Sequence, residues 1–275
     1  MPKRDPLVTV AIPLYNNQDF IAATISSVLA QTYSNFELLI VDDCSSDRSM
    51  EIAEQFNDPR LRLFRHERNL GAEGNWNYCL QHARGKYVKL LCSDDLISPD
   101  CLAKQVKVLE DDAEESIAVV CCSRRIVDHR GRELMTRKFA FAEGRHDGAS
   151  CIKKNVVRGT NFIGEPAGVM FRTAMRERVG LFSANPAYTI DIDYWCRLLR
   201  YGDLYGIKAP LATFRLSKQS CSSTIGRRQC RQFWQFIDQQ RTTKEPPLSA
   251  ALVWTGKIRA FVNTILRLAV FRLFA

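Results

Sequence analysis

The sequence lacks paired metal-ligand or disulfide spacing, although it contains ten cysteines. None of them forms a CxxC pair, which argues against a zinc site or a disulfide framework and favours reduced thiols in a cytosolic compartment. The four histidines (His66, His82, His129 and His146) show no ligand spacing either. No stretch of about 18 uncharged apolar residues is present, so we expect no membrane-spanning helix. The opening stretch MPKRDPLVTV has no apolar core, and we expect no secretory signal.

Two phosphate-binding motifs are also missing. The chain has no Walker A sequence, and no G-x-G-x-x-G follows the first predicted strand. These absences argue against a P-loop enzyme and against a dinucleotide-dependent dehydrogenase. A nucleotidyltransferase would normally carry a glycine-rich, basic loop after that strand, and IPLYNNQDF is neither glycine-rich nor basic.

The positive charge is concentrated at the C-terminal end. The formal net charge is +9, and nine lysines and arginines follow Ile225 against only Asp238 and Glu245. This last part therefore carries +7, and the remainder of the chain is nearly neutral. A nucleic-acid-binding protein would not divide its charge in this way, so we expect no nucleic-acid partner.

Apolar runs alternate with helical patterns over the first half of the chain. Strands are predicted at 7–15, 36–42, 60–66 and 86–91, and helices at 17–33, 71–85 and 98–112, the last with Ser98 as N-cap. This alternation indicates an α/β fold with a mostly parallel sheet flanked by helices. Further on, the patterns predict a strand at 116–128, a turn at 128–133, a helix at 191–202 capped by Gly202, and two short strands within 204–216.

Two pairs of aspartates end predicted strands of this sheet. Asp42 and Asp43 follow one strand, and Asp94 and Asp95 follow another. Each pair alone is explained by capping of the next helix. Two pairs at the carboxyl edge of one sheet, where ligands bind in such folds, also suit oxygen coordination of Mg²⁺ or Mn²⁺ together with phosphate oxygens.

Two blocks of the sequence resemble the family 2 glycosyltransferases, which are inverting enzymes with the GT-A fold. The blocks are VAIPLYNNQDFIAATISSVLAQTYSNFELLIVDDCSSD and NLGAEGNWNYCLQHARGKYVKLLCSDDLISPDCL, the second ending in a D-x-D-type motif. The resemblance covers about the first 105 residues and returns more weakly at IGEPAGVMFR and DIDYWCRLLRYG. It implies a Rossmann-like nucleotide-sugar-binding fold.

The resemblance also implies site residues for the donor. The nucleotide-sugar-binding residues would be Pro13, Tyr15, Asn16, Asp42, Asp43, Arg68, Asn69 and Asp94. Asp43, or its neighbour Asp42, would accept a hydrogen bond from the base, and Arg68 has the alternative of a solvated surface charge. Asp95 would be the chief protein ligand of a Mn²⁺ or Mg²⁺ ion bridging the diphosphate, with Asp94 near the ribose or the metal.

The sequence departs from the family pattern at two places. Cys92 stands where many members have an aspartate. The stretch FRLSKQSCSS has Ser217 or Gln219 where some members supply a histidine ligand, so we expect fewer protein ligands to the metal, and Lys218 is a candidate phosphate contact.

On the acceptor side, the family's acidic motif aligns with DIDYWCRL. The alignment makes Asp191 the catalytic base and Asp193 the alternative base, with simple N-capping as the other explanation of Asp191. By analogy, Glu165 would contact an acceptor hydroxyl, whereas Trp195 and Leu198 belong to the core.

We therefore expect an inverting, metal-dependent glycosyltransferase that uses a UDP- or dTDP-sugar and a glycan or lipid-linked acceptor. The alternatives are a non-catalytic nucleotide-sugar- or carbohydrate-binding subunit, suggested by Cys92 and Ser217, and a nucleotidyltransferase. Residues 1–225 would form the glycosyltransferase domain, and residues 226–275 a basic helical extension.

The last 25 residues predict an amphipathic helix. Arg259, Asn263 and Arg267 would form a narrow polar stripe. The wide apolar arc would comprise Leu252, Trp254, Ile258, Phe261, Val262, Ile265, Leu266, Leu268, Phe271 and Phe274. Such a helix suits an anionic membrane surface, which would place the protein peripherally on the cytoplasmic face of a membrane. The alternative is a helix docked on the catalytic domain or on a partner.

Overall fold

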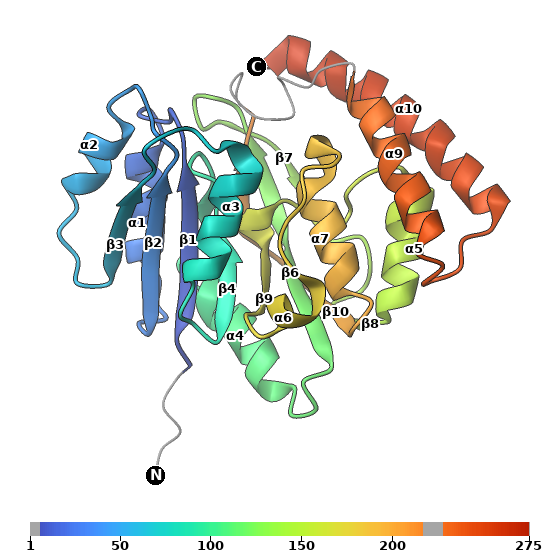
Figure 1. The fold of residues 1–275 in the computed structure, drawn as a ribbon, viewed down its shortest axis with the longest axis horizontal. Coiled ribbons are helices and arrows are strands. Elements are labelled where there is room, and N and C mark those ends of the chain that lie inside the picture. The colour runs from blue at the N-terminus through green and yellow to red at the C-terminus, as the bar shows by residue number, and fades with distance from the viewer. Residues whose placement is uncertain (1–5, 217–227, 275) are drawn as a thin grey trace.

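The computed structural model describes residues 6–216 and 228–274, with side chains to residue 269 (Figure 1). The strands are β1 (Val8–Leu14), β2 (Phe36–Asp42), β3 (Leu61–Arg65), β4 (Tyr87–Leu90), β5 (Leu96–Ile97), β6 (Ile117–Val127), β7 (Glu133–Arg137), β8 (Gly144–His146), β9 (Val169–Arg172) and β10 (Asp203–Arg215). The α-helices are α1 (Ile21–Leu29), α2 (Ser49–Glu54), α3 (Gly71–His82), α4 (Cys101–Asp111), α5 (Gly148–Arg158), α6 (Met175–Val179), α7 (Ile190–Leu198), α9 (Arg228–Thr242) and α10 (Ala250–Phe274). Two short 3₁₀ turns are η1 (Pro166–Gly168) and η2 (Ala187–Thr189).

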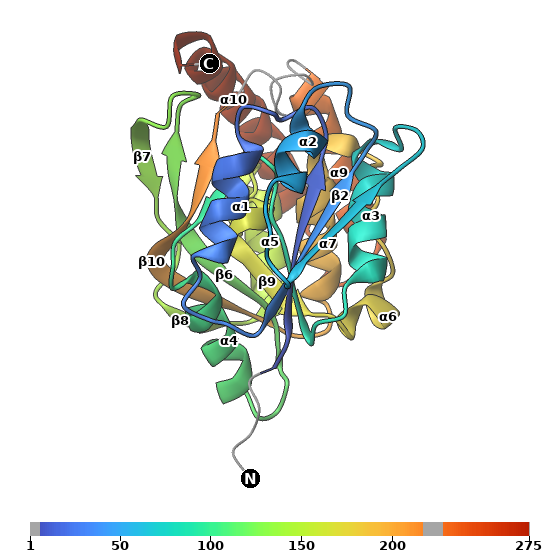
Figure 2. The ribbon, with the colours of Figure 1, turned by 90° about the vertical axis from the view of Figure 1, so that its left-hand side faces the viewer.

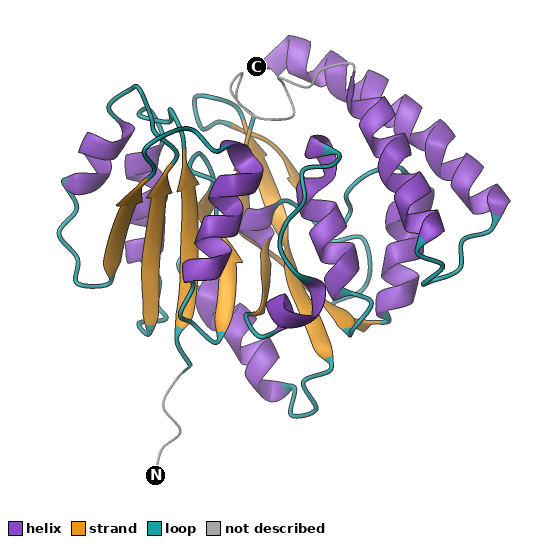
Figure 3. Ribbon diagram, in the orientation of Figure 1, coloured by secondary structure: helices purple, strands orange, loops and turns teal. Residues whose placement is uncertain are grey.

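One sheet forms the centre of the molecule, with helices on both sides (Figure 3). Its strand order is β3-β2-β1-β4-β9-β6-β10-β5, with β7 beside β6 and β8 beside β10. Strands β3, β2, β1 and β4 are parallel, β6 and β10 are parallel to each other, and β9 runs antiparallel to both of its neighbours. The predicted α/β class with a central sheet flanked by helices is confirmed, and the sheet is mixed, with parallel pairing from β3 to β4 and between β6 and β10.

Each face of the sheet has its own apolar core, because successive side chains of a strand point to opposite faces. Val8, Val10 and Ile12 of β1 pack with α1 and α4 on one face. Ala11 belongs to the other core, which includes residues of α3, α5, α7, α9 and α10. Figures 1 and 2 show α1 and α4 on the side of the sheet opposite α3 and α7.

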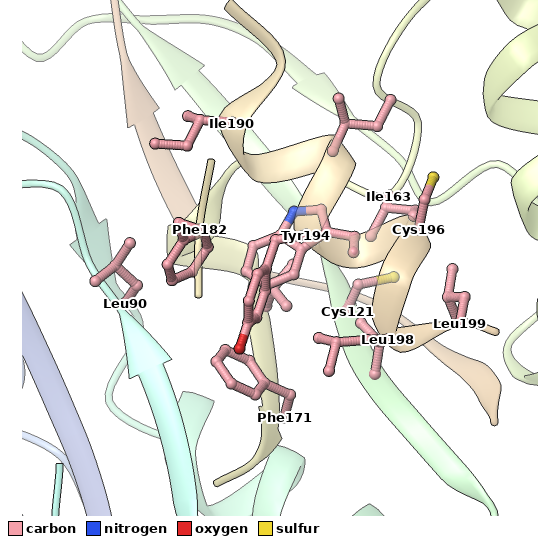
Figure 4. Packing of buried hydrophobic residues seen from close by; sticks show 14 of the residues in the cluster. Leu90, Cys121, Ile163, Phe171, Phe182, Ile190, Tyr194, Cys196, Leu198 and Leu199 are labelled. Carbon is pink, nitrogen blue, oxygen red and sulfur yellow. The ribbon is translucent and has the colours of Figure 1, made fainter. Parts of the chain in front are cut away.

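Stacked aromatic rings fix α7 against the sheet (Figure 4). The Tyr194 ring lies between Phe182 and Phe171, with centroids 3.9 and 5.5 Å away. Trp195 and Leu198 are fully buried, so their predicted place in the core is confirmed. This packing holds the N-terminal turn of α7, which carries Asp191, in a fixed position.

A buried asparagine ties α3 to the ends of the first two strands. Asn75 is 3% exposed, and its side-chain amide donates to the Val41 carbonyl at 3.0 Å and to the Leu14 carbonyl at 3.4 Å. Two carbonyls that water cannot reach are thereby satisfied. Asn75 thus has a structural reason to stand in the GAEGNWNY block.

Three predicted details were wrong. Helix α4 begins at Cys101 rather than beside Ser98, because the backbone N–H of Ser98 donates to the Leu211 carbonyl and extends the β5–β10 pairing.

Helix α7 ends at Leu198 and is not capped by Gly202. Gly202 instead lets two backbone segments approach closely, since a Cβ there would lie 2.5 Å from the Ser116 carbonyl oxygen. The two short strands expected within 204–216 are one strand, β10. Its pairing with β6 shifts register around Pro210, which has no N–H to donate.

The C-terminal helix docks through its polar side. The polar stripe bonds to the end of α5 and to the loop after it: Arg259 donates to the Val157 carbonyl, and the Asn263 amide donates to the carbonyls of Arg158 and Gly159. Val253 and Ala260 are buried in the core beside α5 and α9.

The opposite side of α10 is apolar and exposed. We call it the outer face of α10, and it consists of Trp254, Ile258, Phe261, Val262, Ile265 and Leu266, each 47–67% exposed. Phe271 and Phe274 lie outside the described side chains, and the predicted boundary at residue 225 falls outside the described chain. Within the described parts of the chain, no helix is long and apolar enough to cross a membrane.

Candidate active site

A cavity of about 1330 Å³ lies at the carboxyl ends of β1, β2 and β4. One wall comes from these strand ends and from the start of α3, and the opposite wall comes from β7, the 160–166 loop, α7 and α10. The location is the one expected of a ligand site in a parallel α/β sheet. Its size suits a substrate larger than a single sugar.

The segment after β1 forms part of the first wall. Pro13, Tyr15 and Asn16 all line the cavity, as the resemblance implied, and the Tyr15 side chain is 48% exposed. Asn16 has a left-handed backbone (φ 48°), and its side-chain oxygen accepts from the Ser46 N–H at 2.8 Å. This bond fixes the turn and leaves the Tyr15 ring facing the cavity entrance.

In the first aspartate pair, one residue is buried in the structure and the other lines the cavity. Asp42 is fully buried and absent from the cavity wall; its carboxylate accepts from the Ser45 N–H and hydroxyl and pairs with Arg65 at 3.2 Å. Asp43 does line the cavity, and its carboxylate accepts from the Leu70 N–H at 2.7 Å. Of the two aspartates, only Asp43 is placed to meet a ligand.

Of the neighbouring residues Arg68 and Asn69, only Asn69 lines the cavity. Asn69 lines the cavity, and its side-chain amide donates to the Asp43 carbonyl at 3.3 Å. Arg68 is exposed and does not belong to the cavity wall. The structure therefore places Arg68 in the position of a solvated surface charge.

The second aspartate pair divides in the same way. Asp94 lines the cavity, whereas Asp95 is 1% exposed and accepts from the Arg215 N–H at 3.0 Å. Burial, followed by the neighbouring charge of Asp94, raises the pKa of Asp95 well above its usual value. Asp95, the expected chief metal ligand, is therefore buried and is absent from the cavity wall.

The residues at this corner partly fit a divalent cation. The second carboxylate oxygen of Asp95 has no hydrogen-bond partner among the described residues, and Asp94 is adjacent. A cation would satisfy this oxygen and offset the repulsion between the two carboxylates. No cluster of three or more His, Cys, Asp or Glu suited to a metal occurs in the described chain, so diphosphate oxygens would have to supply further ligands. Ser217, Lys218 and Gln219 lie outside the described residues.

On the opposite wall, Asp191 faces the cavity from the first turn of α7. Its carboxylate accepts from the Asn161 amide at 2.8 Å and from the Ile192 N–H at 2.7 Å. Burial, and to a lesser extent the charge of Glu165, raises the pKa of Asp191 to about 7, although these two hydrogen bonds oppose the rise. A carboxylate with this pKa can accept a proton near neutral pH, as a general base must.

Asp193 points elsewhere. It does not line the cavity, and its carboxylate pairs with Arg197 at 2.9 Å one turn along the same helix. Arg197 in turn donates to the Leu181 carbonyl at 2.8 Å. Asp193 therefore anchors the segment before α7, and of the two predicted bases only Asp191 faces the cavity.

Glu165 lines the cavity but has a partner of its own. It forms an ion pair with Arg124, a residue that is only 2% exposed. Burial raises the pKa of Glu165, but the charges of Arg124 and Arg137 outweigh burial and leave this pKa below its usual value. Glu165 is thus an ionised carboxylate close to two arginines, on the wall formed by β7, the 160–166 loop, α7 and α10.

Several cavity residues were not predicted from the sequence. Asn17, Trp76, Ser93, Asn161, Arg137 and Arg267 all contribute to the walls. Asn17 and Ser93 lie inside the two family-like blocks and next to predicted residues, so their positions offered a signal. Arg137 and Arg267 lie outside these blocks, and no motif marked them.

The sequence matches known glycosyltransferases. The profile of Glycosyl transferase family 2 matches residues 9–178. The chain is 34% identical over 201 residues to an uncharacterized protein of Mycobacterium tuberculosis, covering 70% of this chain but only 62% of that relative. It is 32% identical over 222 residues (79% of this chain, 82% of the relative) to a Bacillus subtilis protein named as a teichuronic acid biosynthesis glycosyltransferase, TuaG. An Escherichia coli UDP-Glc:α-D-GlcNAc-diphosphoundecaprenol β-1,3-glucosyltransferase is 41% identical over 105 residues, 38% of this chain and 42% of that relative.

Two solved structures share the fold. Staphylococcus aureus TarS (residues 1–349) in complex with UDP-GlcNAc superposes with a TM-score of 0.69 at 19% identity, over 94% of this chain and 72% of TarS. A mannosyltransferase from Pyrobaculum calidifontis in complex with GDP-Man and Mn²⁺ gives a TM-score of 0.60 at 20% identity, over 99% of this chain and 74% of that protein. These likenesses confirm the GT-A fold. With a family profile that matches more than half of its length, the chain belongs to glycosyl transferase family 2.

Proposed function

We propose that this protein transfers a sugar from a UDP- or dTDP-sugar to a hydroxyl of a glycan or lipid-linked acceptor, with inversion at the anomeric carbon. The observation that carries the proposal is the position of Asp191. It faces the same cavity as Asp43 and Asp94 but from the opposite wall, and its pKa is raised to about 7. A donor held along the strand ends would present its anomeric carbon toward that carboxylate.

The wall formed by the ends of β1, β2 and β4 and by the start of α3, which we call the donor wall, suits a nucleoside diphosphate. Asp43 would accept a hydrogen bond from the base, and Pro13, Tyr15 and Asn69 would line the nucleotide pocket. Asp94 and Asp95 would hold a divalent cation, Mn²⁺ or Mg²⁺, and this cation would neutralise charge that develops on the departing diphosphate. The mannosyltransferase neighbour that contains Mn²⁺ supports this assignment.

The chemistry requires one displacement. The Asp191 carboxylate takes the proton of the acceptor hydroxyl, and the acceptor oxygen forms a bond to the anomeric carbon. The bond from that carbon to the diphosphate oxygen breaks, and the nucleoside diphosphate leaves with the electron pair. Asn161 would keep Asp191 oriented, since its amide donates to the carboxylate at 2.8 Å. A single attack from the face opposite the leaving group inverts the anomeric centre.

The names of the relatives support the classes of donor and acceptor. TarS binds UDP-GlcNAc, and the Escherichia coli relative uses UDP-glucose and a diphosphoundecaprenol-linked sugar. TuaG is named for the synthesis of an acidic polysaccharide. We therefore extend the proposal to polysaccharide biosynthesis at a membrane, with the outer face of α10 as the surface that would contact the lipid.

Product analysis tests this function against both alternatives. The protein would be incubated with UDP-glucose, UDP-GlcNAc and dTDP-rhamnose, with Mn²⁺ or EDTA, while nucleoside diphosphate and pyrophosphate are measured separately. A glycosyltransferase releases nucleoside diphosphate, slowly to water and faster with acceptor, and its product has the anomeric configuration opposite to that of the donor. In a separate incubation with UTP and glucose 1-phosphate, release of pyrophosphate would indicate a nucleotidyltransferase. Binding without turnover in either incubation would indicate a non-catalytic subunit.

A further inference from the structure

The wall formed by β7, the 160–166 loop, α7 and α10, which we call the acceptor wall, carries charges of both signs. Its carboxylates are Glu133, which pairs with Arg125 at 3.7 Å, Glu165, which pairs with Arg124, and Asp191. Lys138 lines the cavity as well. Arg137, at the end of β7, and Arg267, on α10, also line the cavity. Neither of these two arginines forms an ion pair with any described residue, and residues 217–227 contain no Asp or Glu that would provide one.

Both unpaired guanidinium groups reach the same hydroxyl. Arg137 donates to the Thr160 hydroxyl at 3.5 Å, and Arg267 donates to it at 3.4 Å. Arg267 also donates to the Gln229 side-chain oxygen at 2.9 Å, and its guanidinium group lies over the Tyr188 ring, 5.5 Å from the ring centroid. These partners are neutral, and the two bonds to Thr160 are long. The two arginines come from segments 130 residues apart in the sequence, so the fold brings their charges together on one threonine.

This arrangement is costly without a ligand. Burial lowers the pKa of Arg137, as does the nearby Arg124. Burial also lowers the pKa of Arg267, to about 10, and the charge of Arg137 contributes. The charge of Glu165 opposes the lowering of both arginine pKa values, but Glu165 forms its ion pair with Arg124. Like charges withdrawn from water destabilise each other unless an anion joins them. The planar fork of a guanidinium group matches two oxygens of a phosphate, so a phosphate ester is the ligand that two such groups recognise best.

We propose that Arg137 and Arg267, with Thr160 between them, bind a phosphate group of the acceptor, so that the acceptor is a sugar carried on a phosphate or diphosphate ester. This inference rests on the proposed function and adds a binding subsite to it. The subsite lies on the wall that carries Asp191, whereas Asp43 and Asp94 belong to the wall at the strand ends.

Calorimetric titration of the full-length protein tests the subsite. Saturating UDP and Mn²⁺ would fill the donor site first, and the probes would be decyl diphosphate, inorganic pyrophosphate and the neutral decyl glucoside. We expect decyl diphosphate to bind, and its affinity to fall about 10- to 100-fold in Arg137→Gln and in Arg267→Gln, because each variant removes a charge-assisted hydrogen bond. Arg267→Lys should retain part of the affinity. Binding of pyrophosphate with the same arginine dependence would show that phosphate alone is recognised, and binding of decyl diphosphate only would show that the lipid contributes.

The matched control is Arg259→Gln, which lies two turns before Arg267 on the same helix and bonds to the Val157 carbonyl outside the cavity. It should bind decyl diphosphate like the wild type. Equal affinity of the wild type and both cavity variants, or preference for decyl glucoside over decyl diphosphate, would overturn the inference. If UDP and Mn²⁺ themselves do not bind, the proposed function fails as well. Normal UDP binding without diphosphate binding would reject the subsite alone.

Discussion

The two neighbouring aspartates of each pair have different environments. Asp42 ends β2, and side chains alternate in direction along an extended backbone, so Asp42 and Asp43 face opposite ways. Asp42 contacts Ser45 and Arg65, while Asp43 reaches the cavity. Asp94 and Asp95 lie in the turn between β4 and β5, where Asp95 is buried against β10 and Asp94 lines the cavity. One member of each pair supports the loop, and the other is available to a ligand.

The role of Asp94 leads to a prediction about metal dependence. In the wild type, UDP with Mn²⁺ should raise the melting temperature well above its value with UDP and EDTA, because a ligand that binds only the folded state stabilises it. Asp94→Asn should lose most of this difference. The exposed Asp19→Asn serves as the control and should keep it. An undiminished Mn²⁺ effect in Asp94→Asn would exclude Asp94 as a ligand.

Asp95 requires a different substitution. Its carboxylate accepts from the Arg215 N–H and is buried, so Asp95→Ala would destabilise the fold by about 1–3 kcal/mol in addition to any effect on the metal. Asp95→Asn keeps an acceptor for that N–H and removes the charge. It is therefore the informative variant at this position.

The raised pKa of Asp191 predicts a pH dependence. A general base acts in its ionised form, which is populated above its pKa, so kcat/KM should rise about tenfold per pH unit below pH 7 and level off above it. Initial rates at low substrate concentration, measured from about pH 5.5 to about pH 8.5, report the ionisation of the free enzyme. A profile that stays flat through pH 7 would contradict the assignment of Asp191 as the base.

Among the elements of the first 112 residues, strands β1 to β4 and helices α1, α3 and α4 could be predicted because their apolar periods are clear, whereas the short α2 and β5 were not predicted. Details that depend on tertiary pairing could not be predicted: Ser98 bonds to β10 rather than capping α4, and Pro210 lies within one strand rather than between two. Most of the donor wall could be predicted, because its residues follow strands in recognisable blocks. Arg137 and Arg267 could not, because only the packing of β7 and α10 brings them together.

The crossing of α5 and α10 depends on glycine. A Cβ on Gly256 would lie 2.3 Å from the Val156 carbonyl oxygen, so the two helix backbones are nearly in contact. We predict that Gly256→Val forces the helices apart and lowers the free energy of unfolding by about 1–3 kcal/mol in urea titrations. Ala251→Val, on an exposed position of the same helix, should change it by less than about 0.5 kcal/mol. Equal unfolding midpoints for the two variants would mean that this crossing contributes little.

In the whole molecule, the two sides of α10 differ in what they contact. The sequence suggested either membrane binding or docking on the catalytic domain, and the structure shows that the polar stripe docks while the outer face remains exposed. Within the stripe, Asn263 and Arg267 are partly buried, whereas Arg259 remains exposed. The segment after Ile225 carries +7, which would attract anionic lipid.

We therefore predict salt-sensitive binding to phosphatidylglycerol vesicles and weak binding to phosphatidylcholine vesicles, measured by co-sedimentation. The triple variant Trp254→Ser, Phe261→Ser and Ile265→Ser should lose most of this binding, because it removes apolar area from the outer face and leaves Val253 and Ala260 in the core. Tyr201→Ser, which changes an exposed aromatic residue elsewhere, should bind like the wild type. Unchanged binding by the triple variant would refute membrane contact through this face.

The central claim is that two walls, built from distant parts of the chain, bring a nucleotide-sugar donor to the Asp191 carboxylate. The most direct test is the kcat of Asp191→Asn beside that of Asp193→Asn, with the nucleotide sugar that supports turnover. Asp191→Asn should lower kcat about 10²- to 10⁴-fold with little change in the KM for the donor, because the amide keeps the shape but cannot take the proton. Asp193→Asn, which faces Arg197 outside the cavity, should retain most of the activity. Wild-type kcat in Asp191→Asn, or a large loss only in Asp193→Asn, would contradict the claim.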